Sequence, residues 1–241
     1  MPVALVTGGS AGLGRELVAD LAADGWTVVT DGRRPDRLAD LTASLPTPAT
    51  PGPGRVVALP GDVTDADHRT ALRDALAEAG ALDLLVHNAS TLGPTPLPPL
   101  AEVRIDDLQR VWRTNVGAPL VLTAELLPLL VASRGVLLSI SSDAAVEHYP
   151  GWGLYGASKA GLDHVTLTFA AENPAITAYA VDPGDMRTAM QQAAFPGEDI
   201  GDRPLPATVV PRLRALLAQR PPSGRYRAVD IPAGAAPGEV A

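Results

Sequence analysis

Short apolar runs alternate with helical patterns along the chain, and this alternation constrains the fold more than any other feature. Because the runs are apolar at nearly every position, they are typical of strands that are buried on both faces of a parallel sheet. A regular alternation of strands and helices predicts an α/β fold with one doubly wound parallel sheet flanked by helices. The predicted strands cover residues 3–7, 27–30, 55–59, 82–86, 135–141, 176–181 and 223–226.

These elements account for a single domain over residues 1–232. A chain of 241 residues is long enough to bury a sizeable core. The proline-rich segment 45–54 is expected to form a surface loop, and a last amphipathic helix is expected at 206–217. The small residues of segment 233–241 predict a flexible C-terminal tail.

The first strand leads directly into a glycine-rich turn, which is followed by a helical pattern through Ala23. The turn has the sequence Thr7-Gly8-Gly9-Ser10-Ala11-Gly12-Leu13-Gly14. Such a turn lets the backbone approach a pyrophosphate, and the N–H groups at the start of the helix point toward its charge. Close packing of the helix on the strand is the alternative explanation for the glycines.

Tyr155 and Lys159 stand four residues apart in a segment that is expected to be helical, which puts both side chains on one face. An ammonium near a phenol favours the phenolate, so Lys159 is expected to lower the pKa of Tyr155 toward the working pH of a general acid or base. Lys159 is also the only lysine in the chain. Since a lysine pKa can be tuned and an arginine pKa cannot, this single use indicates a site. The alternative is an ordinary solvated pair.

Ser142 lies at the carboxyl end of the strand predicted at 135–141, where open α/β sheets bind their ligands. A serine thirteen residues before Tyr155-x-x-x-Lys159 resembles the short-chain dehydrogenase/reductase family. The glycine turn, with Thr7 included, is similar to the family's Thr-Gly-x-x-x-Gly-x-Gly pattern.

This resemblance implies a Rossmann-type fold and an oxidoreductase that exchanges a hydride between NADP(H) or NAD(H) and a small-molecule carbonyl or secondary alcohol substrate. Tyr155 would be the general acid/base, Lys159 would hold the nicotinamide ribose, and Ser142 would hydrogen-bond the substrate oxygen. Asn115 lies within the apolar face of a helix expected from about Asp106, and it would hold a water behind the lysine. A satisfied buried amide or a local kink is the alternative for Asn115. The resemblance also implies a homodimer or homotetramer.

Residues 31–33, at the end of the second strand, bear on the choice of cofactor. By the resemblance, the carboxylate of NAD-preferring members falls on Gly32, and the arginine of NADP-preferring members falls on Arg33. Asp31 stands one position early for that carboxylate. We therefore expect NADP(H), with NAD(H) as the alternative.

Three further motifs complete the predicted cofactor site. Residues 62–63 would contact the adenine, while Asp65 is expected to cap the helix at 66–79. Residues 87–90 are similar to the family's Asn-Asn-Ala-Gly with two changes, and His87 is expected to be structural. Residues 183–188 resemble the family's Pro-Gly-x-x-x-Thr beside the nicotinamide. The predicted cofactor contacts are Thr7, Gly8, Ser10, Ala11, Gly12, Leu13, Gly14, Asp31, Gly32, Arg33, Asp62, Val63, Asn88, Ala89, Ser90, Tyr155, Lys159, Pro183, Gly184, Met186 and Thr188.

Two segments are candidates for the substrate pocket, although their apolar residues are equally compatible with ordinary packing. Residues 186–205 are expected to form a loop over the substrate, with contacts at Met186, Met190, Gln191 and Phe195. The segment before the catalytic tyrosine offers Tyr149, Pro150, Trp152 and Leu154.

Composition excludes several classes of function. The chain has no cysteine, which excludes a disulfide framework and a thiolate metal site, and no other metal-ligand pattern stands out. A net charge of −8 disfavours nucleic acid and anionic membranes as partners. The chain starts without a basic stretch, and its longest apolar region, residues 120–132, is too short to span a bilayer. We expect a cytoplasmic protein without a membrane or nucleic-acid partner.

Two other functions stay open on the sequence alone. A non-catalytic dinucleotide-binding sensor or scaffold would share the fold, but such proteins usually lose the tyrosine or the lysine. An epimerase or dehydratase of the same fold would usually carry a larger C-terminal part.

Overall fold

The structure of the protein is a computed structural model, and it describes residues 1–45 and 54–232. The proline-rich loop predicted at 45–54 lies almost wholly outside the described residues. The predicted tail at 233–241 lies outside them entirely.

Within the described residues, seven parallel strands form one sheet in the order β3-β2-β1-β4-β5-β6-β7. All of the predicted strands are confirmed, and the α/β fold with a Rossmann-type sheet is confirmed with them. The order reverses between β1 and β4, and ligands of such sheets bind beyond the carboxyl ends of the strands at this reversal. The strands are β1 (Val3–Val6), β2 (Thr27–Gly32), β3 (Val56–Pro60), β4 (Leu84–His87), β5 (Val136–Ile140), β6 (Thr177–Asp182) and β7 (Gly224–Arg227).

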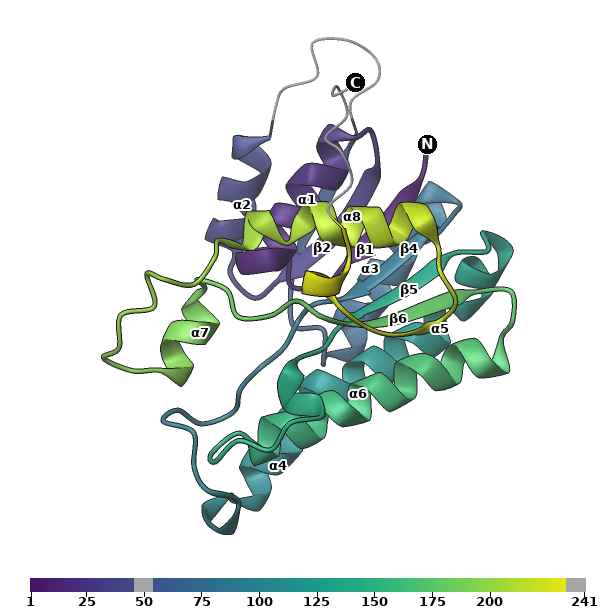
Figure 1. Cartoon of the computed structure of the whole chain (residues 1–241). Coiled ribbons are helices and arrows are strands. Elements are labelled where there is room, and N and C mark those ends of the chain that lie inside the picture. The colour runs from purple at the N-terminus through teal and green to yellow at the C-terminus, as the bar shows by residue number, and fades with distance from the viewer. Residues whose placement is uncertain (46–53, 233–241) are drawn as a thin grey trace.

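Helices cover both faces of the sheet (Figure 1). One face packs against α1 (Gly12–Ala23), α2 (Pro35–Ser44) and α8 (Val210–Gln219), and the other against α3 (Ala66–Ala79), α5 (Ala118–Ala132) and α6 (Gly153–Glu172). Successive residues of a strand point to opposite faces. Val6 of β1 therefore belongs to the hydrophobic cluster under α1, α2 and α8, and Leu5 belongs to the cluster under α3, α5 and α6. This two-sided burial explains why the strands are apolar throughout.

A continuous helical stretch precedes β5. It consists of α4 (Ile105–Trp112), a π-helical turn (Arg113–Gly117) and α5. Over the 28 residues from Ile105 to Ala132 this stretch is long and apolar enough to cross a membrane. The expectation that the longest apolar region covers only residues 120–132 and is too short to span a bilayer is therefore wrong. The apolar side chains of α5 pack on the sheet through Leu122, Leu126 and Leu130, which is typical of a core helix.

Two segments near the C-terminus differ from expectation. The region 186–205, expected to be a loop, contains the short helix α7 (Ala189–Ala194), because Thr188 Oγ1 caps it by accepting a hydrogen bond of 3.1 Å from the Gln191 N–H. The last helix begins at Val210 rather than Pro206, since residues 206–208 form a separate 3₁₀ turn. Figure 1 shows α7 projecting from the body of the sheet.

Candidate active site

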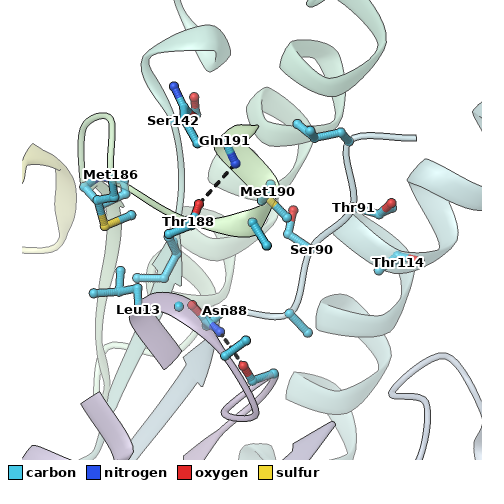
Figure 2. A pocket seen from close by; sticks show the side chains of 18 of the residues that line it. Leu13, Asn88, Ser90, Thr91, Thr114, Ser142, Met186, Thr188, Met190 and Gln191 are labelled. Carbon is cyan, nitrogen blue, oxygen red and sulfur yellow. Dashed lines mark hydrogen bonds between the residues drawn. The ribbon is translucent and has the colours of Figure 1, made fainter. Parts of the chain in front are cut away.

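A cavity of about 780 Å³ runs along the carboxyl ends of the strands on both sides of the reversal. It is lined by the glycine turn and by residues that follow β2, β4, β5 and β6, as well as by the first turns of α6 and α7. Figure 2 shows side chains from these separate segments around it, among them Asn88, Ser142 and Thr188. All of the predicted catalytic residues and cofactor contacts line this cavity except Thr7, Gly14 and Asn115.

Thr7 and Gly14 support the glycine turn from behind. Thr7 Oγ1 accepts hydrogen bonds of 3.1 Å from the N–H groups of Asn88 and Ala89. The Asn88 amide donates to the carbonyls of Thr7 and Gly8 at 2.9 and 3.1 Å. A Cβ at Gly14 would lie 2.3 Å from that amide nitrogen, so a larger residue would push the helix off the turn. Close packing therefore does explain Gly14, while the neighbouring residues of the turn are open to the cavity.

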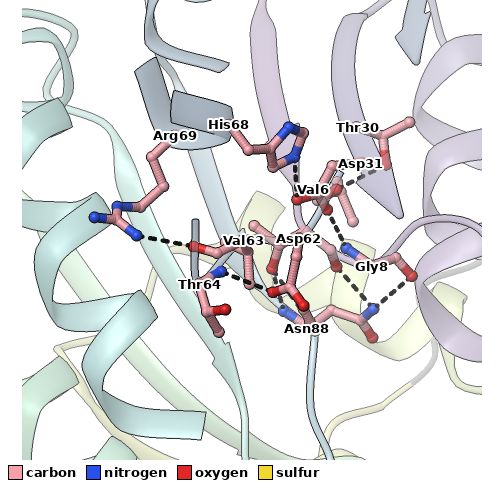
Figure 3. A network of polar contacts seen from close by, with 12 residues as sticks. Val6, Gly8, Thr30, Asp31, Asp62, Val63, Thr64, His68, Arg69 and Asn88 are labelled. Carbon is pink, nitrogen blue, oxygen red and sulfur yellow. Dashed lines mark hydrogen bonds and ion pairs between the residues drawn. The ribbon is translucent and has the colours of Figure 1, made fainter. Parts of the chain in front are cut away.

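The Asp31 carboxylate is occupied by the protein itself (Figure 3). Its Oδ1 accepts a hydrogen bond of 2.6 Å from the Gly8 N–H, and its Oδ2 lies 3.1 Å from His68 Nε2. Only 2% of Asp31 is exposed. Sequence reasoning missed His68, because a histidine in the first turn of a helix carries no signal of a partner 37 residues away.

The residues that follow Asp31 in the sequence differ in whether their side chains are available to a ligand. A Cβ at Gly32 would lie 2.6 Å from Ser10 Oγ, so no carboxylate could stand at Gly32 without displacing Ser10. Arg33 is exposed on the cavity and forms no ion pair with any described residue. Arg34 instead pairs with Asp36 at 2.6 Å. Arg37 also lines the cavity, a contact that the sequence analysis did not anticipate.

These residues fit a dinucleotide. The turn presents backbone N–H groups at the start of α1, in the geometry that suits a pyrophosphate. A free guanidinium at Arg33 suits a phosphate on the adenosine ribose better than a bare ribose. Asp62 and Val63 line the cavity near that end, and Asp65 caps α3 as expected, accepting from the Asp67 N–H at 3.2 Å.

Tyr155 and Lys159 lie on one face of α6, which begins at Gly153, and both side chains are buried. Lys159 Nζ stands 5.5 Å from the centroid of the Tyr155 ring. It also donates a hydrogen bond of 2.8 Å to the carbonyl of Ile140, the last residue of β5. The lysine is thus held between the helix and the strand end, and an ordinary solvated pair is excluded.

The expected effect of Lys159 on Tyr155 is wrong for the chain by itself. Burial raises the pKa of the Tyr155 phenol above its ordinary value, against the opposing hydrogen bonds of Ser90 and Ser142. Burial also lowers the pKa of Lys159 to about 8. The spacing of the two residues predicts their proximity but not the burial of both groups, and burial is the larger effect. At neutral pH the phenol is therefore protonated.

Ser142 stands two residues beyond β5, as expected, and caps a 3₁₀ turn at Asp143–Ala145. Its hydroxyl donates to Asp143 Oδ1 at 3.0 Å and accepts from the Ala144 N–H at 3.2 Å. The other oxygen of Asp143 accepts a hydrogen bond of 3.0 Å from the Tyr149 hydroxyl. Asp143 lines the cavity and was missed, although its position next to the candidate serine was the available signal.

Asn115 lies within the π-helical turn and is fully buried. Its Oδ1 accepts hydrogen bonds from Ser90 Oγ and the Thr91 N–H at 3.2 and 2.8 Å, and its Nδ2 donates to the Thr91 carbonyl and to Ser158 Oγ at 2.9 Å each. The alternative of a satisfied buried amide is thus confirmed, and the helix has a π-helical turn at the point where a local kink was considered. The role of Asn115 in a water relay stays a prediction.

His87 is the last residue of β4, and its side chain is buried against α5. Its Nε2 lies 2.7 Å from Thr123 Oγ1. Burial, with a smaller contribution from the charge of Lys159, lowers the pKa of His87 to about 3. The imidazole is therefore neutral at ordinary pH.

The substrate candidates divide into two groups. Pro150 and Leu154 do not line the cavity, and Leu154 turns into the interior because it lies on the buried side of α6. The ring of Trp152 packs against the rings of Tyr155 and Phe195, with centroids 5.7 and 6.0 Å apart. The candidates that line the cavity are Tyr149, Trp152, Met186, Met190, Gln191 and Phe195. No group of three metal-binding side chains occurs among the described residues.

Comparison with known proteins places this geometry in context. The family model described as short chain dehydrogenase matches residues 2–199. The chain is 31% identical over 211 residues to the uncharacterized oxidoreductase YciK of Escherichia coli strain K12, covering 87% of this chain and 83% of that protein. It is 31% identical over 189 residues to a serine 3-dehydrogenase of Agrobacterium fabrum, covering 76% and 72% of the two chains.

A solved structure is also similar to this chain. A short chain dehydrogenase from Shigella flexneri, in complex with NADP, superimposes with a TM-score of 0.84 at 30% sequence identity. The match covers 95% of this chain and 97% of that one. The similarity therefore extends over the whole sheet and its helices.

Proposed function

The chain is an oxidoreductase that belongs to the short-chain dehydrogenase family, and on that premise we propose that it reduces a carbonyl compound with NADPH, or oxidises the corresponding secondary alcohol with NADP⁺. Tyr155 is the general acid/base of this reaction. The observation that carries the proposal is the pairing of a buried phenol with a buried lysine in the cavity that also contains the glycine turn.

Three observations favour NADP(H) over NAD(H). Arg33 lines the cavity without an ion-pair partner among the described residues, so its guanidinium is available to a phosphate. The Asp31 carboxylate is already bonded to Gly8 and His68, so it is not available to the ribose hydroxyls. The similar Shigella flexneri protein was solved with NADP.

Each catalytic residue has a distinct task in the proposed reaction. When bound, the cofactor supplies or accepts the hydride. Tyr155 donates its phenolic proton to the carbonyl oxygen as negative charge develops there, and the raised pKa of the buried phenol keeps this proton in place until the substrate arrives. Ser142 turns its hydroxyl from Asp143 toward the same oxygen and stabilises the charge. Lys159 provides positive charge beside the phenol and a hydrogen bond to the nicotinamide ribose.

The proton lost by Tyr155 has to be replaced from solvent. We assign this task to a water held behind Lys159 by Asn115. Because the Asn115 side chain already makes four hydrogen bonds, a water there would have to bind a backbone group of the π-helical turn. π-Helical turns inside α-helices are frequent at functional sites.

The side chains around Trp152 favour a substrate with an apolar part next to its carbonyl or alcohol carbon. The rings of Tyr149, Trp152 and Phe195 and the side chains of Met186 and Met190 line this end of the cavity. Aromatic and thioether groups pack against apolar ligands without demanding a particular shape.

The proposal is tested by titrating the purified protein with NADPH and NADH in parallel, followed by an assay of NADPH oxidation with ketones and aldehydes of increasing apolar size. We expect tighter binding of NADPH and turnover of at least some of the carbonyl compounds. Binding of neither dinucleotide would contradict the proposal, and binding without turnover of any carbonyl or alcohol would favour a sensor.

We also propose that the chain forms a homodimer or homotetramer through α4 and α5. Leu108, Trp112 and Leu120 of these helices are large apolar side chains that remain more than a third exposed. Light scattering should give a mass of two or four chains, and Leu120→Glu should lower it. A wild-type mass of one chain would exclude the proposal.

A further inference from the structure

Asp163 lies one helical turn after Lys159 on α6, and its carboxylate is only 8% exposed. Its Oδ2 accepts a hydrogen bond of 3.1 Å from Arg225 Nε. Its Oδ1 is buried as well, and the Ser141 hydroxyl faces the carboxylate. Burying a carboxylate is costly and raises the pKa of Asp163, against the opposing hydrogen bonds of Ser141 and Arg225, so this residue needs an explanation beyond packing.

Arg225 connects the carboxylate to the end of β5. This arginine belongs to the edge strand β7, and its guanidinium reaches α6 and the segment that follows β5. Besides its bond to Asp163, it donates a hydrogen bond of 2.8 Å to the carbonyl of Ser142. Arg225 therefore fixes Asp163 relative to the strand end that carries the catalytic serine.

Few other groups near Lys159 stabilise its charged form. Within the part of the chain that the structure describes, its ammonium makes one hydrogen bond, to the Ile140 carbonyl. From β4 it faces His87, which is neutral at ordinary pH, and from its own helix it faces the aromatic ring of Tyr155. Arg225 is already engaged with Asp163. The remaining carboxylates that line the cavity nearby, Asp143 and Asp182, act on the phenol of Tyr155.

Asp163 is therefore the carboxylate that acts on the lysine. Burial disfavours the ammonium form of Lys159, and the charge of Asp163 is what opposes this effect. Residues four apart on a helix are neighbours on its surface, which gives this pair its proximity.

We propose that Asp163, held by Arg225, is a positioning residue that keeps the buried Lys159 in its charged form. The consequence for catalysis rests on the oxidoreductase function proposed above. The charge state of the lysine itself does not depend on that function, so the two can be tested separately.

The direct test uses the fact that Lys159 is the only lysine in the chain. Protein labelled with ¹³C-lysine gives one Cε signal in an NMR spectrum, and its shift with pH reports the titration of this one side chain. We expect Asp163→Asn to move the midpoint about one pH unit lower, because an opposite charge nearby is lost. Glu172→Gln, an exposed residue of the same helix, removes the same charge and should leave the midpoint unchanged.

Two further variants separate the effect of the charge from an effect on folding. Asp163→Glu retains the charge and should restore the midpoint toward that of the wild type. Asp163→Ser is the second variant without the charge, to be used if the asparagine protein does not fold. An unchanged or higher midpoint in either folded charge-removing variant would overturn the proposal.

The catalytic consequence is measured in the pH profile of kcat. If Lys159 must be charged, the decline of kcat at alkaline pH should begin about one unit lower in Asp163→Asn than in the wild type. A purely structural role would lower kcat equally at every pH and would contradict the proposal. If the wild type turns over no carbonyl compound, the proposed function fails, while the NMR result still decides the role of Asp163.

Discussion

The Gly8 N–H donates a hydrogen bond of 2.6 Å to Asp31 Oδ1, which ties the glycine turn to the end of the neighbouring strand. The other carboxylate oxygen is bound by His68 at the start of α3. An acid at the end of the second strand often binds the ribose of NAD. In this protein the acid instead fixes the backbone of the glycine turn, the proposed pyrophosphate site.

Asp31→Ala should therefore weaken the binding of NADPH and NADH by a similar factor. The loss of one charged hydrogen bond to the turn corresponds to about a tenfold increase in each Kd. Calorimetric titration with both dinucleotides measures this effect, with Asp36→Ala, an exposed carboxylate next to the site, as the control. A loss confined to NADH would show that Asp31 contacts the ribose after all.

Arg33→Ser should raise the Kd for NADPH by about 10- to 100-fold, since a charged hydrogen bond to phosphate contributes about 1.5 to 3 kcal/mol. The Kd for NADH should stay within about twofold, because NADH lacks the extra phosphate. Arg34→Ser is the matched control, since Arg34 is the adjacent arginine and already pairs with Asp36. An equal increase in Kd for both dinucleotides would show that Arg33 does not bind the extra phosphate.

Tyr155→Phe should lower kcat by at least about 100-fold while the Kd for NADPH stays within about twofold, because the ring is kept and the proton donor is lost. Tyr149→Phe is the control, since this second tyrosine lines the same cavity but directs its hydroxyl to Asp143. Steady-state kinetics together with cofactor titration give both quantities. Near-normal turnover of Tyr155→Phe would end its assignment as the acid.

His87 should make the fold sensitive to acid. Its pKa is about 3 in the folded chain and about 6.5 in the unfolded chain, so the unfolded state binds the extra proton between these values. The stability that this residue contributes is complete above pH 6.5 and is lost as the pH falls toward 3. Each pKa unit corresponds to about 1.4 kcal/mol, which makes the total loss a few kcal/mol.

Urea unfolding at several pH values across this window measures the effect. The free energy of unfolding of His87→Asn should depend less on pH than that of the wild type. His148→Asn, at an exposed histidine, should behave like the wild type. Identical pH dependence in all three proteins would mean that the His87 imidazole takes up its proton without unfolding.

The parts of the site that depend on local sequence could be predicted. The strands follow from apolar runs, the glycine turn from its spacing, and the shared face of Tyr155 and Lys159 from helical periodicity. Their meeting in one cavity follows as well, because parallel strands bring all of their carboxyl ends to one edge.

The contacts between distant side chains could not be predicted. Asp31 and His68 are 37 residues apart, and Asp163 and Arg225 are 62 residues apart, with no pattern in either segment that marks the partner. The sign of the Tyr155 pKa shift was wrong for a related reason. It depends on how completely both groups are buried, and burial is a property of the packed fold rather than of their spacing.

Lys159 is 2% exposed, and the sequence contains no second lysine. Reagents that couple to amines, such as succinimidyl esters and aldehydes, therefore find no accessible side chain on the folded protein and are left with the α-amino group of the chain. Dyes, biotin or a solid support attached in this way would reach a single defined point. The protein is thus suited to site-selective conjugation without engineering, and any amine coupling beyond the first would report that the fold has opened around its active site.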